Sequence, residues 1–180
     1  EDITLRALRI LKEVDLILCE DTRQTRKLLD RHEIKKELLS YHARSGFSKT
    51  EKIFELLENG NDLALVSDAG TPGISDPGTV LASKIREKFG EKVKIIPIPG
   101  PTALIAALSA SGLPTREFTF LGFLPHKKGR ETLFKEIAAA VRTYVFYESP
   151  HRILKTLESL NKFCPDKKVC LARELTKIYE

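Results

Sequence analysis

The segment "LALVSDAGTPGISDPG", residues 63–78, joins an apolar run to a loop rich in glycine, proline and aspartate. Four apolar residues in succession, 63–66, are typical of a strand. Glycines let a ligand approach the backbone, and prolines limit the entropy that a loop loses when it becomes ordered. Because ligands of open α/β sheets bind beyond the carboxyl ends of strands, we interpret this loop as a binding site. A purely structural turn is the alternative.

Strand and helix patterns alternate on both sides of this loop. The apolar runs predict strands at residues 16–19, 38–42, 62–67, 93–98, 117–124, 143–148 and 167–173. The segments between them predict helices at residues 2–13, 22–31, 48–59, 76–89, 102–111, 130–140 and 149–160. Strands separated by helices indicate an α/β fold with parallel pairing in at least the first half. A Pro-Gly-Pro turn at residues 99–101 marks the domain boundary, which gives an N-terminal α/β domain, 1–99, and a C-terminal α/β domain, 100–180.

Three of these helices carry recognisable start signals. Ser48 with Glu51 has the spacing of a capping box, Asp76-Pro77 suits an N-cap followed by proline, and Ser149-Pro150 suits the start of the last helix. Asn59-Gly60 predicts the end of the helix that begins at Ser48.

The composition is that of a soluble globular protein, with 42% hydrophobic and 31% charged residues in a chain of 180. A net charge of +5 favours an anionic partner without identifying one. The three cysteines, Cys19, Cys164 and Cys170, form no CxxC pair and no ligand cluster, so we expect reduced thiols in the cytoplasm and no metal. The uncharged stretch 95–115 is interrupted by prolines, so we expect no membrane span.

The polar groups of the glycine loop indicate the kind of ligand it suits. The loop lacks the lysine of a P-loop and the spacing of a dinucleotide-binding fingerprint. Asp68 and Asp76 would repel a phosphate, whereas carboxylates suit hydroxyls, amines or a cation. S-adenosylmethionine carries a ribose, an ammonium and a sulfonium, and it therefore matches this loop better than ATP or NAD does.

Several long motifs carry a resemblance to a known family. "VSDAGTPGISDPG", "PIPGPTALIAALSASGLPT", "FTFLGFLPHKKG", "VFYESPHRI" and "LARELTK" together resemble the tetrapyrrole methylase superfamily and, within it, the ribosomal RNA small subunit methyltransferase I family. The resemblance implies two α/β domains of the tetrapyrrole methylase type, with S-adenosylmethionine in the cleft between them. It also implies 2′-O-methylation of a cytidine in the decoding region of 16S rRNA, a homodimer, and a bacterial cytoplasmic location. A first strand before residue 1 and further chain after residue 180 are expected as well.

The loop and the resemblance together give a set of expected cofactor-binding residues. It comprises Ser67, Asp68, Ala69, Gly70, Thr71, Gly73, Ile74, Ser75, Asp76, Pro101, Thr102 and Ala103. Thr102 stands where the family commonly has serine, and it keeps the hydroxyl.

Charged residues at two further strand ends are candidates for the chemistry and for RNA contacts. Asp21, Glu148 and His151 are candidate catalytic bases, and the sequence does not select among them. Candidate RNA-binding residues are Arg23, Lys127, Lys128, Arg130 and Arg152. The basic run 126–130 also suits a simple solvated face.

Three classes of function fit these features. The first is an RNA 2′-O-methyltransferase acting on 16S rRNA in the small ribosomal subunit. The second is a methylase of a small tetrapyrrole of the precorrin or uroporphyrinogen type, against which the basic run 126–130 and the segment 147–152 argue. The third is a non-enzymatic RNA-binding protein, against which the acidic glycine loop argues.

Overall fold

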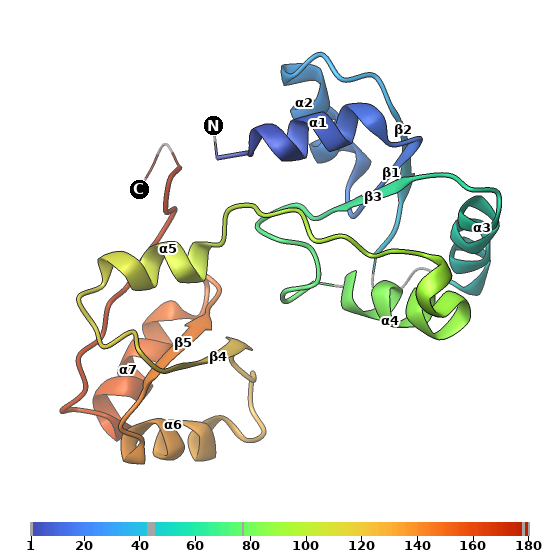
Figure 1. Ribbon diagram of the computed structural model, residues 1–180. Helices are drawn as coiled ribbons and strands as arrows, with labels where there is room; N and C mark the ends of the chain where they lie inside the picture. Colours follow the sequence, from blue (N-terminus) through green and yellow to red (C-terminus); the bar gives the residue numbers. More distant parts are fainter. Residues whose placement is uncertain (1, 43–45, 77, 178, 180) are drawn as a thin grey trace. The chain divides into compact units, whose positions relative to one another are not determined.

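The computed structural model describes residues 2–42, 46–76, 78–177 and 179 (Figure 1). The chain divides into two compact units, Glu1–Thr102 and Ala103–Glu180. Each unit contains helices and a parallel sheet, so the predicted α/β class is confirmed.

The first unit is built around a three-stranded parallel sheet with strand order β2-β1-β3. In chain order its elements are α1 (Leu5–Glu13), β1 (Leu16–Cys19), α2 (Thr22–Arg31), β2 (Glu37–Ser40), α3 (Phe47–Glu58), β3 (Leu63–Val66), α4 (Gly78–Phe89) and the 3₁₀ turn η1 (Gly90–Lys92). The strands pair in step, so that Cys19 lies opposite both Ser40 and Val66. The loops that follow the three strands therefore leave from one edge of the sheet.

The central strand β1 is buried along its whole length because helices cover both of its faces. Successive strand side chains point to opposite faces of a sheet. Ile17 accordingly packs in a cluster with Leu11 of α1 and Leu29 of α2. Leu16 and Leu18 pack on the other face, in a cluster that includes Ile53 of α3 and Leu81 of α4. This double burial explains why β1 is an unbroken apolar run.

Within its described residues, the second unit contains a two-stranded parallel sheet and three α-helices. Its elements are α5 (Ala103–Ala110), β4 (Phe118–Phe123), α6 (Arg130–Ala139), β5 (Thr143–Tyr147) and α7 (Ile153–Phe163). A register shift interrupts the β4–β5 pairing between Phe120 and Phe123. The core contains Leu124, Phe134 and Leu160, and the rings of Phe134 and Phe163 stack at 6.2 Å. Both strands again end at the same edge of their sheet.

Two predicted strands, 93–98 and 167–173, are not formed in the structure. Both segments run without regular secondary structure, and Ile96 and Leu171 are 70% and 58% exposed. An apolar pattern in the sequence indicates which side chains favour burial. A strand also needs the backbone of a neighbouring strand with which to form hydrogen bonds. Pro97 further removes one backbone donor from the first segment.

Three predicted helix starts are also wrong. The helix predicted from residue 2 begins at Leu5, with Thr4 as its N-cap. The helix α3 begins at Phe47 with Gly46 as its N-cap, so Ser48 lies inside the helix and makes no capping bond. The helix α7 begins at Ile153 and not at Ser149. Ser149 instead begins a turn, in which its carbonyl accepts from the Arg152 N–H at 2.9 Å. The bounds of α2 and the end of α3 at Asn59-Gly60, where Gly60 has a φ of +81°, are confirmed.

Candidate functional site

The loop after β3 is closed on itself by the carboxylate of Asp76. The Gly73 N–H donates to both carboxylate oxygens, Oδ1 and Oδ2, with N···O distances of 2.8 Å. The Gly78 N–H donates to Oδ1 at 2.7 Å. The Thr79 hydroxyl donates to the Gly73 carbonyl at 2.6 Å. Asp76 thus caps the start of α4 as the sequence predicted, while Pro77 lies outside the described residues.

The glycines of the loop are required by its geometry at two positions. Gly73 has a φ of +88°, a left-handed conformation that side chains other than glycine rarely adopt. A Cβ on Gly78 would lie 2.9 Å from Asp76 Oδ1, from the Gly73 nitrogen and from Leu65 Cδ2. The loop therefore has one defined shape, in which the Asp76 carboxylate is already used.

The outer part of the same loop presents unused polar groups. Asp68, Ala69 and Gly70 are exposed at the carboxyl end of β3. The Asp68 carboxylate makes no hydrogen bond or ion pair with the residues that the structure describes. A side chain at Gly70 would meet no atom within 4 Å, so the backbone is open to a ligand there. This part of the loop can bind hydroxyl or ammonium groups without losing an internal bond.

The structure joins this loop to the proline-rich turn in the same unit. The Thr71 hydroxyl donates to the Pro101 carbonyl at 3.2 Å. The Thr4 hydroxyl donates to the Pro99 carbonyl at 3.2 Å and caps α1 by accepting from the Ala7 N–H. Two segments of the expected cofactor set, 67–76 and 101–102, therefore lie together.

The bonds among the described residues assign no binding role to the remaining members of that set. Ile74 and Ser75 are exposed, and Ser75 has a φ of +60°. The Ser67 hydroxyl donates to the Ala69 carbonyl at 3.1 Å, while Thr102 is half-buried and Ala103 is exposed.

Asp21 and Arg23 form a pair after β1. Asp21 is the N-cap of α2, where its Oδ1 accepts from the Arg23 N–H at 2.8 Å, and its Oδ2 lies 2.7 Å from the Arg23 Nη2. The hydrogen bonds from the side chain and then the backbone of Arg23 lower the pKa of Asp21 to about 2. Burial raises the pKa of the nearby Cys19 thiol, and the charges of Asp68 and Asp21 raise it further. The charges of Asp21, after β1, and Asp68, after β3, thus both affect Cys19, the last residue of β1.

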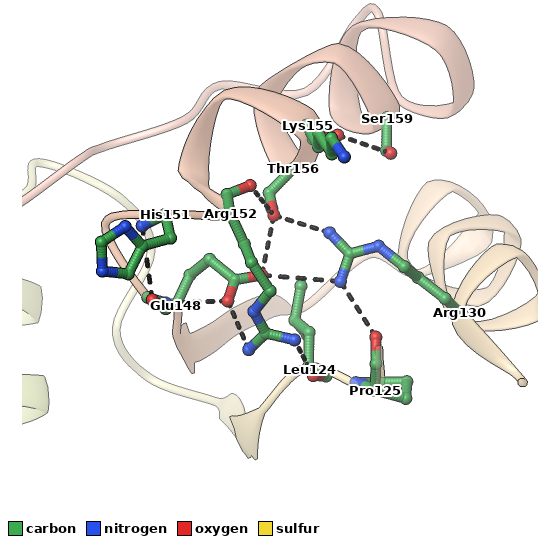
Figure 2. Close-up of polar contacts among 10 residues, drawn as sticks. Leu124, Pro125, Arg130, Glu148, His151, Arg152, Lys155, Thr156 and Ser159 are labelled. Atoms are coloured by element: carbon green, nitrogen blue, oxygen red, sulfur yellow. Dashed lines mark hydrogen bonds and ion pairs between the residues drawn. The ribbon is translucent and has the colours of Figure 1, made fainter. Parts of the chain in front are cut away.

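A second polar centre lies at the carboxyl end of β5, where Glu148 is bound by four donors (Figure 2). Its Oε1 lies 2.5 Å from Arg152 Nη2 and accepts from the Ser149 N–H at 2.8 Å. Its Oε2 accepts from the Thr156 hydroxyl at 2.7 Å and lies 3.5 Å from Arg130 Nη1. Only 3% of the Glu148 side chain is exposed. We call Arg130, Glu148, Arg152 and Thr156 the Glu148 cluster.

The environment of Glu148 keeps its carboxylate ionised at neutral pH. Burial alone would raise the pKa, but the hydrogen bonds from Thr156 and Ser149 and the charges of Arg152 and Arg130 outweigh it and hold the pKa of Glu148 below its ordinary value. One carboxylate faces two guanidinium groups, so the cluster keeps a surplus positive charge.

The two arginines of the cluster also bind the backbone that follows β4. Arg130 donates to the Pro125 carbonyl at 3.1 Å and to the Thr156 hydroxyl at 2.6 Å. Arg152 donates to the Leu124 carbonyl at 3.1 Å, and its buried Nε has no partner among the described residues. Sequence analysis missed the fully buried Thr156. Its position four residues after Arg152, on the same side of the helix, was the available signal.

The other predicted residues of this unit are exposed. Lys127 and Lys128 lie on the turn between β4 and α6, where the Arg130 N–H donates to the Lys127 carbonyl at 3.3 Å. His151 lies on the turn after β5, and its imidazole makes no hydrogen bond within the described part of the chain.

The described residues offer neither a metal site nor a membrane-spanning helix. No group of three or more His, Cys, Asp or Glu side chains is placed to hold a metal ion in this part of the chain. Within the same residues, no helix has both the length and the apolar character needed to cross a membrane.

Comparisons with known proteins identify the family to which this sequence is similar. The family model of the tetrapyrrole (corrin/porphyrin) methylases matches residues 1–180. Proteins named ribosomal RNA small subunit methyltransferase I are 46%, 48% and 47% identical in Thermotoga maritima, Hydrogenobaculum sp. and Synechocystis sp.. These matches cover 99–100% of this chain and 80%, 77% and 64% of the respective relatives.

Two solved structures have the same fold at low sequence identity. The methyltransferase CobJ is 22% identical with a TM-score of 0.61, over 90% of this chain and 70% of that protein. A cobalt precorrin-4 methyltransferase is 18% identical with a TM-score of 0.62, over 89% of this chain and 69% of that protein.

Proposed function

Because this chain belongs to the tetrapyrrole methylase family and, within it, to the ribosomal RNA small subunit methyltransferase I family, we propose that it methylates 16S rRNA of the small ribosomal subunit. The methyl donor is S-adenosylmethionine, and the acceptor is the ribose 2′-hydroxyl of a cytidine in the decoding region. The observation that carries this proposal is the identity of 46–48% with relatives of that name over essentially the whole chain.

The loop after β3 fits the cofactor that this reaction needs. The Asp68 carboxylate is free to accept from hydroxyl or ammonium donors, and the exposed backbone at Gly70 admits a ligand closely. The cofactor supplies an electrophilic methyl group on a sulfonium. The protein's part is to hold that methyl in line with the ribose oxygen and to help to remove the hydroxyl proton.

Among the three candidate bases, the contacts favour His151. Hydrogen bonds from Arg23 lower the pKa of Asp21, so this carboxylate is a weak proton acceptor. The pKa of Glu148 is also below its ordinary value, because the hydrogen bonds from Thr156 and Ser149 and the charges of Arg152 and Arg130 outweigh its burial. The His151 imidazole is exposed and unused, and imidazole is the most common general base near neutral pH. It would accept the proton that the ribose hydroxyl loses as the oxygen–carbon bond forms and the carbon–sulfur bond breaks.

The exposed cations suit contacts with RNA phosphates. Lys127 and Lys128 project from one turn, and Arg23 is 86% exposed although it pairs with Asp21. The guanidinium groups of Arg130 and Arg152 are largely buried and already bind Glu148 and backbone carbonyls, so they are weaker candidates for direct phosphate contact. The homodimer and the cytoplasmic location remain predictions from the family resemblance.

Methyl transfer to purified small ribosomal subunits tests the proposal. The full-length protein should transfer the labelled methyl of S-adenosylmethionine to 16S rRNA, with the product mapped to the 2′-oxygen of one cytidine. Methylation of a uroporphyrinogen-type substrate with the subunits left unmodified would instead support the tetrapyrrole alternative.

A further inference from the structure

We infer that the Glu148 cluster is a positioning device that fixes the turn carrying Lys127 and Lys128 for RNA binding, and that Glu148 and Thr156 act through Arg130 and Arg152. The inference rests on the proposed function and deepens it. It assigns a role to Thr156 and changes the role of Glu148 from base to positioning residue.

The cluster fastens the turn at both of its ends. The turn begins at Leu124 and Pro125, whose carbonyls accept from Arg152 and Arg130, both at 3.1 Å. It ends at Arg130, the first residue of α6, whose side chain reaches back to Pro125 and across to Thr156. The four exposed residues between these anchors, 126–129, include both lysines.

Glu148 holds the two anchors in place from within the protein. Its two oxygens join the end of β5, through the Ser149 N–H, to the Thr156 hydroxyl of α7 and to both guanidinium groups (Figure 2). A carboxylate that is 3% exposed and already accepts from these donors has no access to a substrate hydroxyl. It can act on RNA only through the groups that it orients.

A fixed turn should bind phosphates more tightly than a mobile one. Ordering a flexible segment on binding costs conformational entropy, and a segment that is ordered beforehand avoids much of that cost. Removing a bond of the cluster should therefore weaken RNA binding while leaving the maximal rate of methyl transfer unchanged. A catalytic base would show the reverse, with a large loss of kcat.

Thr156→Val is the most direct test, because it removes only the hydroxyl that joins Glu148 to Arg130. In the full-length protein we expect KM for small ribosomal subunits to rise about 3- to 10-fold, as for one lost hydrogen bond, with kcat retained. Thr156→Ser keeps the hydroxyl and should restore the parent KM. Hydrogen exchange of the amides in 126–130 should be faster in Thr156→Val than in Thr156→Ser.

A double-mutant cycle separates positioning from general destabilisation. In a Lys127→Ala, Lys128→Ala background, Thr156→Val should cause no further rise in KM, because the lysines that the cluster positions are absent. Arg130→Lys offers a second variant if Thr156→Val does not fold. It keeps the charge but cannot bind Pro125, Thr156 and Glu148 together, so it should show the same rise in KM and the same dependence on the lysines.

The outcomes distinguish this inference from the function on which it rests. An equal rise in KM in both backgrounds, a loss confined to kcat, or unchanged exchange of residues 126–130 would overturn the positioning role alone. If the parent protein neither binds nor methylates small subunits, the proposed function fails and the RNA role of the cluster fails with it.

Discussion

The loop after β3 and the Glu148 cluster both follow the carboxyl end of a parallel strand, yet they use their carboxylates in different ways. In the loop, Asp76 binds backbone N–H groups and leaves Asp68 free at the surface. In the cluster, the buried Glu148 side chain binds two partly buried arginines and the buried Thr156. Polar residues at strand ends therefore divide into those that shape a site and those that a ligand can reach.

The largest effect in this comparison is expected from the buried carboxylate. Glu148→Ala leaves two guanidinium groups of a buried network without their counter-charge, so we expect a loss of about 3–5 kcal/mol in the free energy of unfolding. Denaturant unfolding of the full-length protein measures this. A loss below about 1 kcal/mol, the range of surface ion pairs, would mean that the cluster is not a buried network.

A smaller effect is expected where the loop has no room for a side chain. Gly78→Ala places a Cβ 2.9 Å from three atoms, two of which belong to the Asp76–Gly73 bond, and should cost about 1–3 kcal/mol. Because the loop must shift, affinity for S-adenosylmethionine should also fall, as calorimetry would detect. For the stability measurement alone, Gly70→Ala is the control for crowding: its Cβ would meet no atom within 4 Å, while its φ of +72° adds strain and its place in the expected cofactor set rules it out as a control for cofactor affinity.

The two aspartates of the loop should separate shape from binding. Asp76→Ala removes the cap of α4 and should lower the free energy of unfolding by about 1 kcal/mol. Asp68→Ala should change the free energy of unfolding by no more than about 0.5 kcal/mol, as is usual for a surface substitution. It should, however, lower the affinity for S-adenosylmethionine. Equal losses of stability in the two variants would contradict the division drawn here.

Acidification should lower the free energy of unfolding by protonating Glu148. The loss should be smaller than that caused by Glu148→Ala. The folded-state pKa of Glu148 is below its ordinary value, so its contribution to stability is complete above the ordinary glutamate pKa of about 4.3 and is lost as the pH falls through the folded value. Stability measured between pH 7 and pH 3 should therefore fall more steeply in the parent protein than in Glu148→Gln. If stability falls with pH equally in the parent protein and in Glu148→Gln, the ionised Glu148 carboxylate does not contribute to stability.

Sequence patterns located what depends on local chemistry. The bounds of β1 and α2 follow from an apolar run and from a polar helix that begins next to Asp21, and both were predicted to the residue. Patterns failed where partners distant in sequence decide the structure. The segment 93–98 is apolar but has no paired backbone, and Ser149 begins a turn instead of capping α7. The spacing of Thr156 from Arg152 was not enough to predict its role, because that role depends on Glu148 and on Arg130, 26 residues away.

The in-step register of β1, β2 and β3 has a consequence for altering this protein. Their last residues lie on one line across the sheet, so the loops after them begin at equal height. One residue inserted within β3 would raise its loop by about 3.3 Å relative to its neighbours and turn the following side chains to the opposite face. Residues inserted beyond Val66 would change only the length of the loop. New specificities should therefore be sought by varying loop length and sequence while the three strand lengths are kept fixed.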